Sequence, residues 1–284
     1  MTGSMPFHSS QRDAALQAMD YALIGPRDNR VHVANTRRFP YNTICYLGRD
    51  FGDRRLRGCT GTLITPQTVL TAAHCIFSHR RGRAPLRIRV IPGRADRNTM
   101  PFGYIDSREY YVPQRYIRIR SSRDPARRYY DYGIIVLPHA FAKLKRFMPV
   151  RALTKIQLDR VRRHGQINVA GYPGDRPLGT LWRHSEYLKR ISPRRLYYTV
   201  DTCPGHSGSP IWFFNRRIRQ HQIIGVHTSG VVNERGRSYG CSRTTVLAPP
   251  GSMNSGVRIT SGVLANIRAP RKRSGAKGPL VRLP

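Results

Sequence analysis

Acidic residues are scarce in this chain of 284 residues, and that scarcity limits the partners it can attract. There are 15 Asp and Glu residues against 50 Lys and Arg, so the formal net charge is +35. Such a surface repels its own copies and attracts polyanions and acidic partners. Arginines are spread along the whole chain, and no zinc-finger or helix-turn-helix pattern accompanies them. The absence of such patterns excludes a recognisable nucleic-acid-binding module, and non-specific binding of polyanions is the interaction that the charge still predicts. We expect a monomer.

Long apolar runs and metal-binding patterns are also absent. No apolar run approaches the roughly 20 residues of a membrane-spanning helix, so we expect no transmembrane segment. The five cysteines form no CxxC pair and the carboxylates are dispersed, so we expect no metal site and no cofactor. The cysteines are Cys45, Cys59, Cys75, Cys203 and Cys241. Two disulfides and one free thiol are the natural count for an exported protein.

The two ends of the chain differ from its middle. Residues 1–22 lack the apolar core of a signal peptide. We therefore expect a secreted protein whose signal has been removed, or one exported by another route, with residues 1–22 as a leader or propeptide remnant. Residues 269–284 are basic and rich in Pro and Gly, which predicts a disordered tail.

Between the ends, short β-like segments alternate with turn residues. They cover 43–48, 59–65, 68–73, 86–92, 132–138, 166–172, 195–202, 210–214 and 222–228. Many short strands without long helices between them predict an all-β barrel or sandwich. The segment 254–267 is predicted to be a helix that closes the fold, and about 140–165 a connection between two halves.

The run DTCPGHSGSP at 201–210 suggests a nucleophile, because a serine flanked by glycines lies in a tight turn that exposes its hydroxyl. Gly205 lets the backbone turn so that its N–H and that of Ser207 form an oxyanion hole, worth a few kcal/mol in a transition state. By itself the motif is weak, since a Gly/Ser turn without catalysis is its ordinary explanation.

The run TAAHC at 71–75 supplies a candidate base, because a serine hydroxyl needs a base and His is the natural one at neutral pH. A lone histidine is more often structural or exposed. Here His74 precedes Cys75, and Cys59 lies sixteen residues earlier. A bridge between these cysteines would contribute roughly 3 kcal/mol and would lock the turn that carries His74.

The run DYGIIVL at 131–137 begins with an aspartate directly before a buried strand, which is unusual unless the carboxylate has a partner. Asp124 is the rival, but it lies in a charged loop with no strand behind it and is interpreted as a surface residue. In the order His74, Asp131, Ser207, the three signals predict a catalytic triad that transfers an acyl group to Ser207 and then hydrolyses the acyl-enzyme.

With these motifs in place, the sequence from Leu23 to Ile267 resembles chymotrypsin-like peptidases, and within them the bacterial glutamyl endopeptidase branch. CTGTLITPQTVLTAAHC, GYPGDRPLGTLW, DTCPGHSGSP, IIGVHTSG and RITSGVLANI carry the resemblance. It implies two antiparallel six-stranded β-barrels, over 23–145 and 146–268, with the active site in the cleft between them. It also implies a second disulfide, Cys203 to Cys241, beside the specificity pocket, while Cys45 stays a buried thiol. His206 stands where trypsin has an aspartate that forms its activation salt bridge.

Two residues predict opposite specificities. Asp201 lies six residues before Ser207, where trypsin keeps the carboxylate that binds Arg or Lys. His227 matches the residue with which glutamyl endopeptidases bind a Glu carboxylate, with Thr202 assisting and Ser229 as a further substrate-binding residue. The glutamyl branch also carries Asp at the position of Asp201, so His227 discriminates better. Only three residues of the chain are Glu, so a Glu-cutting enzyme would rarely cut itself.

We therefore predict a secreted serine endopeptidase that cleaves acidic protein or peptide substrates after Glu. A cut after Ala22 by another protease would free Leu23 and complete the pocket. Cleavage after Arg or Lys stays open as an alternative. So does a cationic polyanion-binding protein of the same fold, against which the intact triad argues.

Overall fold

The computed structural model describes residues 23–52, 56–121, 124–230, 239, 241, 248–269 and 280–283. The expected leader over 1–22 and most of the expected basic tail lie outside these described residues. Within them, no helix is both long enough and apolar enough to cross a membrane.

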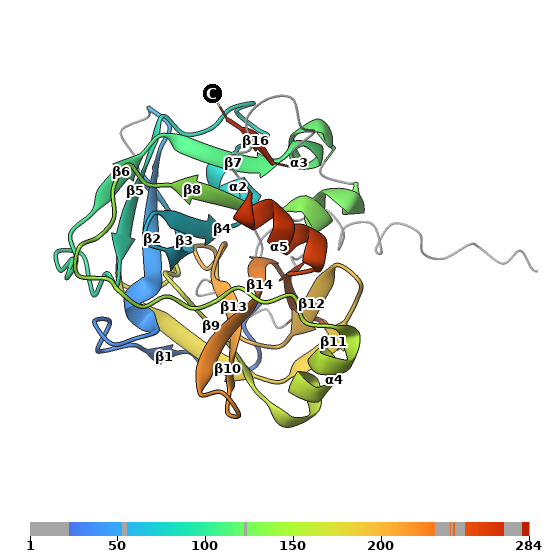
Figure 1. The fold of residues 1–284 in the computed structure, drawn as a ribbon. Helices are drawn as coiled ribbons and strands as arrows, with labels where there is room; N and C mark the ends of the chain where they lie inside the picture. Colours follow the sequence, from blue (N-terminus) through green and yellow to red (C-terminus); the bar gives the residue numbers. More distant parts are fainter. Residues whose placement is uncertain are drawn as a thin grey trace, which may run out of the picture.

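Two antiparallel β-sheets make up most of the described chain (Figure 1). The first sheet, in the upper part of the figure, has the order β16-β7-β8-β4-β3-β2-β5-β6. Its strands are β2 (Ile44–Asp50), β3 (Leu56–Thr65), β4 (Thr68–Thr71), β5 (Arg87–Pro92), β6 (Ile105–Ser107), β7 (Glu109–Pro113), β8 (Gly133–Val136) and β16 (Leu280–Arg282). The second sheet, below it, has the order β1-β10-β9-β13-β14-β15-β12-β11. Its strands are β1 (Val31–His32), β9 (Ile167–Gly171), β10 (Trp182–Glu186), β11 (Leu188–Ile191), β12 (Arg195–Tyr198), β13 (Pro210–Asn215), β14 (Gln220–Ser229) and β15 (Asn254–Arg258).

Each sheet closes into a barrel because the two halves of one bent strand pair with strands near opposite ends of that sheet. Only Arg108 separates β6 from β7, and only Tyr187 separates β10 from β11. β6 pairs with β5 while β7 pairs with β8, and β10 pairs with β9 while β11 pairs with β12. Of the eight labelled strands in each sheet, two are thus halves of one strand and one is an outer addition, β16 or β1. The predicted fold of two six-stranded antiparallel barrels is confirmed.

An apolar interface joins the two barrels. The larger core cluster contains residues of both, among them Leu70 of β4 and Trp212 of β13. The ring of Tyr172 stands edge-on to that of Tyr46, with centroids 5.6 Å apart, and the Tyr172 hydroxyl donates to the Ile44 carbonyl (3.1 Å). Burial of this aromatic surface fixes how the barrels meet, and so positions any site at their junction.

Short helices connect the strands. They are η1 (Tyr41–Thr43), α2 (Ala73–Ile76), α3 (Gln114–Arg118), η2 (Pro125–Tyr130), α4 (Lys155–His164) and α5 (Ser261–Arg268). α4 lies in the segment expected to connect the barrels. A capping box begins it, since the Gln157 N–H donates to the Thr154 hydroxyl and the Thr154 N–H to the Gln157 side chain.

The segment 254–267, expected to be one closing helix, is a strand followed by a helix. The closing helix is confirmed, but it begins only after Thr260, whose hydroxyl accepts from the Val263 N–H as an N-cap. Asn254, at the start of β15, is buried, and its amide donates to the carbonyls of Leu23 and Val200 (2.8 and 2.7 Å). These long-range contacts hold the chain extended, and a local helical pattern does not reveal them.

The expected disorder of the basic tail is wrong for its last described residues. Leu280–Arg282 form β16, which pairs with β7 near the C-terminus in Figure 1. Leu280 and Leu283 are 9% and 3% exposed, and the Leu283 N–H donates to the Tyr110 carbonyl (2.9 Å). Two apolar side chains beyond the charged run cover the first barrel, which composition alone does not predict.

We expect Leu283→Ala to lower the free energy of unfolding by about 2–3 kcal/mol, because it removes a buried leucine from the barrel surface. Arg282→Ala, at the neighbouring exposed position, is the control and should change it by less than about 0.5 kcal/mol. Denaturant unfolding measures both. Equal, negligible effects would mean that this segment does not dock on the barrel.

Candidate active site

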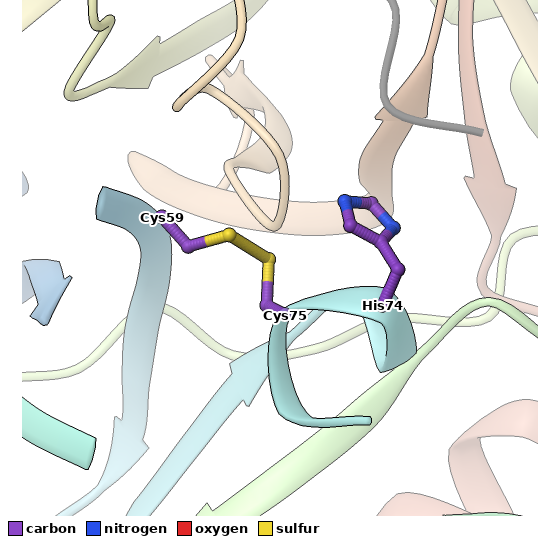
Figure 2. Close-up of side chains that lie close together, drawn as sticks. All are labelled: Cys59, His74 and Cys75. Atoms are coloured by element: carbon purple, nitrogen blue, oxygen red, sulfur yellow. A yellow bond between two sulfur atoms is a disulfide. The ribbon is translucent and has the colours of Figure 1, made fainter. Parts of the chain in front are cut away.

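His74 lies on the short helix α2, which follows the buried strand β4. The disulfide between Cys59 and Cys75 ties α2 to β3, and Figure 2 shows the bridge and the imidazole projecting from the same helix. The bridge expected beside His74 is therefore present. It restricts the backbone on which the ring sits.

A carboxylate orients this ring. His74 Nδ1 lies 2.8 Å from Asp131 Oδ2, and the His74 backbone N–H donates to Asp131 Oδ1 (3.0 Å). Asp131 stands between η2 and β8 and is 1% exposed. Because both of its oxygens accept from one residue, the ring has one preferred orientation, with Nδ1–H toward the carboxylate and Nε2 away from it. The rival Asp124 instead accepts from the Ala126 N–H and caps η2.

Ser207 lies in a turn that is pressed against the first barrel. The Ser207 carbonyl accepts from the Thr60 N–H (2.9 Å). It also lies 3.4 Å from the Sγ of Cys75, the residue that follows His74 in the chain. Gly205 has φ +105°, and a Cβ there would collide with the Tyr172 carbonyl, so only glycine fits. The structure thus brings the candidate residues at 74, 131 and 207 to one junction.

The expected oxyanion donors are free to receive a ligand. In the described part of the chain, the backbone N–H groups of Gly205 and Ser207 have no hydrogen-bond acceptor. Both residues line a cavity of about 450 Å³ whose walls come from both barrels, including Gly58 and Cys59 on one side and Tyr172 on the other. Unpaired amides beside a cavity are able to bind a developing oxyanion.

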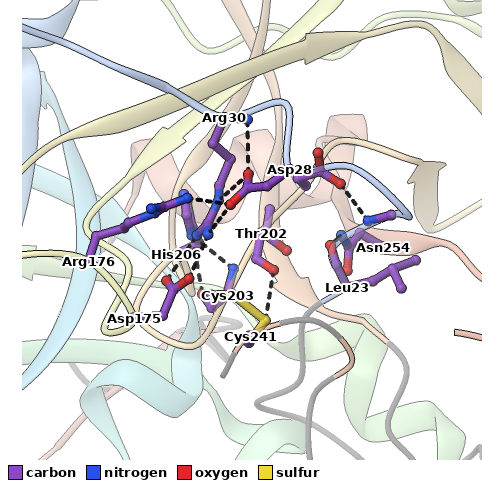
Figure 3. Close-up of a disulfide and its surroundings, with 12 residues drawn as sticks. Leu23, Asp28, Arg30, Asp175, Arg176, Thr202, Cys203, His206, Cys241 and Asn254 are labelled. Atoms are coloured by element: carbon purple, nitrogen blue, oxygen red, sulfur yellow. Dashed lines mark hydrogen bonds and ion pairs between the residues drawn. A yellow bond between two sulfur atoms is a disulfide. The ribbon is translucent and has the colours of Figure 1, made fainter. Parts of the chain in front are cut away.

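His206 occupies a buried electrostatic cluster next to this turn (Figure 3). The guanidinium of Arg30 bonds Asp175 (2.9 and 2.6 Å) and Asp28 (3.0 and 2.8 Å). Burial, aided by the charge of Arg30, lowers the pKa of His206 to about 3, so its ring is neutral at neutral pH. The Gly174 N–H donates to the Pro204 carbonyl (2.8 Å), so this cluster is joined to the Ser207 turn.

Asp201 does not present a free carboxylate. It is 2% exposed, and its two oxygens accept from the backbone N–H groups of Gly25 and Asn29 (2.8 Å each). The Asn29 side chain donates as well (3.3 Å), and His184 lies 3.4 Å away. The segment that begins at Leu23 therefore binds the carboxylate of Asp201, which the trypsin-like hypothesis assigns to a substrate Arg or Lys.

His227, Thr202 and Ser229 are buried near the serine turn. The His227 carbonyl accepts from the Gly208 N–H, and the His227 N–H donates to the Ser209 carbonyl (2.8 Å each). Tyr198 Oη lies 2.7 Å from His227 Nδ1. Burial is the main cause that lowers the pKa of His227 well below 6.5, and it raises the pKa of Tyr198. A protonated phenol donates to Nδ1, which leaves Nε2–H as the donor of a neutral ring.

The cysteines have the pairing that was expected. Cys203 is bonded to Cys241, and Cys45 is a buried free thiol. Among the described residues, the one cluster of potential metal ligands is Cys59, His74 and Cys75 (Figure 2). Its two sulfurs are bonded to each other, so they do not offer thiolate ligands.

Arg30 and Arg195 belong to this site, and sequence reasoning missed both. Arg195 is buried, and its guanidinium contacts Thr228 and Ser229, the two residues after His227. Among the 50 basic residues, no local sequence pattern distinguishes Arg30 and Arg195 from the rest. Only their burial in the structure does.

Two antiparallel barrels with a polar site at their junction are the architecture of chymotrypsin-like serine proteases, and comparisons with known proteins agree. The family model described as Trypsin matches residues 29–246. The chain therefore belongs to the trypsin family of serine proteases.

The resemblance to the glutamyl endopeptidase branch is also confirmed. The chain is 31% identical over 245 residues to the glutamyl endopeptidase of Bacillus licheniformis, with 84% of this chain and 66% of that protein covered. It is 27% identical over 257 residues to a Bacillus subtilis protein named extracellular metalloprotease, with 89% and 71% covered. A solved structure of a Glu endopeptidase matches with a TM-score of 0.67 at 27% identity, covering 88% of this chain and 100% of that one. The chain thus spans about two thirds of the length of the first of these relatives.

We expect Arg30→Met to lower the free energy of unfolding by about 2 kcal/mol, because it leaves Asp28 and Asp175 without their buried cation. Arg162→Met removes only an exposed pair with Asp159 and serves as the control. Denaturant unfolding measures both variants. An Arg30→Met protein as stable as the control variant would contradict a role for this cluster.

We expect stability to fall as the pH drops from about 6.5 toward 4. The pKa of His206 is lowered to about 3, and that of His227 is also lowered. In this range the unfolded chain therefore binds protons that the folded chain does not, and the free energy of unfolding decreases. Thermal unfolding across this range should show a smaller loss for His206→Gln, whereas His139→Gln, at an exposed histidine, should match the parent. A pH-independent melting temperature would disprove the interpretation.

Proposed function

We propose that the chain is a serine endopeptidase that hydrolyses peptide bonds through His74, Asp131 and Ser207. The observation that carries the proposal is the His74–Asp131 hydrogen bond (2.8 Å) beside a serine turn with two unpaired N–H groups. A base with an oriented ring, a glycine-flanked hydroxyl and adjacent amide donors together suit acyl transfer.

In the proposed reaction, His74 Nε2 takes the hydroxyl proton as Ser207 Oγ attacks the carbonyl carbon of the peptide bond. Asp131 holds Nδ1–H and stabilises the imidazolium, while the Gly205 and Ser207 N–H groups bind the oxyanion. His74 then protonates the leaving amine as the C–N bond breaks, which leaves an acyl-enzyme. Water attacks this ester with His74 as base, and the acid product leaves with Ser207 restored.

We propose that the enzyme is secreted and acts on acidic substrates. Two disulfides suit an oxidising compartment, and one relative is named extracellular metalloprotease. The net charge of +35 attracts acidic chains to the surface.

We further propose that it cleaves after Glu. Two of the similar proteins are named Glu or glutamyl endopeptidases. His227 lies beside the Ser207 turn with Nε2–H as its available donor, and Thr202 Oγ1 has no hydrogen-bond partner among the described residues. The trypsin-like alternative is disfavoured because Asp201 already accepts the N–H groups of Gly25 and Asn29.

A peptide library at neutral pH tests the proposal, with Ser207→Ala as the matched control. We expect cuts after Glu with the parent protein and a loss of at least about 1,000-fold in rate with the variant, because the nucleophile is absent. The same assay is run on the full chain and on a chain that begins at Leu23.

Each result assigns a function. Cuts after Arg or Lys would give the pocket to Asp201 and overturn the glutamyl specificity. Activity that appears only in the shortened chain would support residues 1–22 as a leader that must be removed. No cutting by either form, together with heparin binding, would favour the polyanion-binding alternative.

A further inference from the structure

Arg195 is a buried cation inside the second barrel. It is 2% exposed, and it begins β12. Its Nη2 donates to the hydroxyls of Ser229 and Ser255 (2.7 Å each) and of Thr228 (3.1 Å), and its Nη1 donates to the Arg128 carbonyl (2.7 Å). All four acceptors are neutral, and the negative charge that acts on the guanidinium is that of Asp131, which makes no ion pair with it among the described residues.

No carboxylate among the described residues lies within ion-pair distance of Arg195. Burial lowers the pKa of its guanidinium, yet arginine stays protonated in proteins. An unpaired charge in the interior is costly, and an apolar side chain of similar size avoids that cost. A buried cation that makes no ion pair within the described part of the fold is suited to receive the charge of a ligand.

The position of Arg195 indicates the kind of ligand that would neutralise its charge. Thr228 and Ser229 directly follow His227 in β14, and Ser255 pairs with Ser229 across the sheet. A β-bulge between His227 and Ser229 breaks the usual alternation, which allows consecutive hydroxyls to reach one guanidinium. The charge of Arg195 is close enough to His227 to contribute to its lowered pKa. The cation therefore lies beside the proposed pocket.

His227 by itself is a poor receptor for an anion. Its ring is neutral at neutral pH, so it offers the Nε2–H bond without a charge. A substrate carboxylate that leaves water needs both donors and a positive charge nearby. Arg195 supplies the charge that His227 does not carry.

We propose that Arg195 is a specificity-determining residue that compensates the charge of a substrate glutamate through the hydroxyls of Ser229 and Ser255. Each serine oxygen accepts an N–H of Arg195, which directs its own hydrogen outward to a carboxylate oxygen. Among the described residues the Ser255 hydroxyl has two long alternatives to a substrate oxygen, the Ser229 carbonyl (3.4 Å) and the Ser229 Oγ (3.3 Å), which a carboxylate at shorter distance would replace. Because these groups are shielded from water, the charge is screened little. The inference rests on the proposed cleavage after Glu.

The test compares kcat/KM for two peptides that differ only by Glu or Gln before the cleaved bond. Arg195→Met should reduce cleavage of the Glu peptide by about 10- to 100-fold and leave the Gln peptide nearly unchanged. Arg195→Lys, which keeps the charge, should restore part of the preference. Arg258→Met is the matched control, because Arg258 lies on β15 and its guanidinium, among the described residues, donates to the carbonyls of Ser192 and Leu153.

A second variant keeps the test decisive if Arg195→Met does not fold. Ser229→Ala with Ser255→Ala keeps the cation and removes the two hydroxyls, so it should lower the Glu to Gln ratio several-fold. Thermal unfolding confirms that each variant is folded before its kinetics are compared.

The outcomes separate this inference from the proposed function. A parent enzyme that prefers Glu, with an unchanged Glu to Gln ratio in both folded variants, overturns the role of Arg195 alone. Equal losses on both peptides would assign Arg195 to support of the barrel or of Asp131 and also overturn it. A parent enzyme without preference for Glu overturns the specificity, and this inference with it.

Discussion

The contact between the Ser207 turn and strand β3 is the constraint on which the site depends. The Thr60 N–H donates to the Ser207 carbonyl, and the Thr60 hydroxyl donates to the Gly205 carbonyl (2.7 Å). This approach is possible because Gly208 lacks a side chain, since a Cβ there would overlap the Thr60 carbonyl. The second barrel thereby sets its serine against the disulfide-bonded helix of His74. Glycines around the serine are thus required by the meeting of two barrels as well as by a local turn.

Buried charge in this protein is arranged so that histidines stay neutral. Arg30 is balanced by Asp28 and Asp175, and its field helps to keep His206 uncharged. Arg195 makes no ion pair among the described residues, where the charge of Asp131 acts on it, and it in turn acts on His227. The chain already has a net charge of +35, so these two cations matter through their buried positions beside histidines and not through the charge that they add.

The strand pattern and the three motifs were readable from the sequence because each depends on neighbours in the chain. Apolar segments such as 132–138 and the runs around His74 and Ser207 are local signals, and the structure places the strands there. The sequence does not predict β10 and β11, because their residues are mostly polar and partly exposed and neither segment shows an apolar alternation. The local pattern of β15 predicts a helix, whereas contacts with distant residues hold the segment extended.

Asp201 shows most clearly where local reasoning ends. In the sequence it supports two opposite specificities, because a carboxylate six residues before a nucleophile suits both. Its hydrogen-bond partners, Gly25 and Asn29, are 176 and 172 residues away, so the sequence does not reveal that both oxygens are occupied. Once their amides occupy both oxygens, the carboxylate serves to anchor the segment that begins at Leu23. The Leu23 carbonyl in turn accepts from the N–H of Thr202 (3.0 Å), a residue of the proposed pocket. Any process that moved this segment would therefore change the surroundings of Thr202 and Asp201 together.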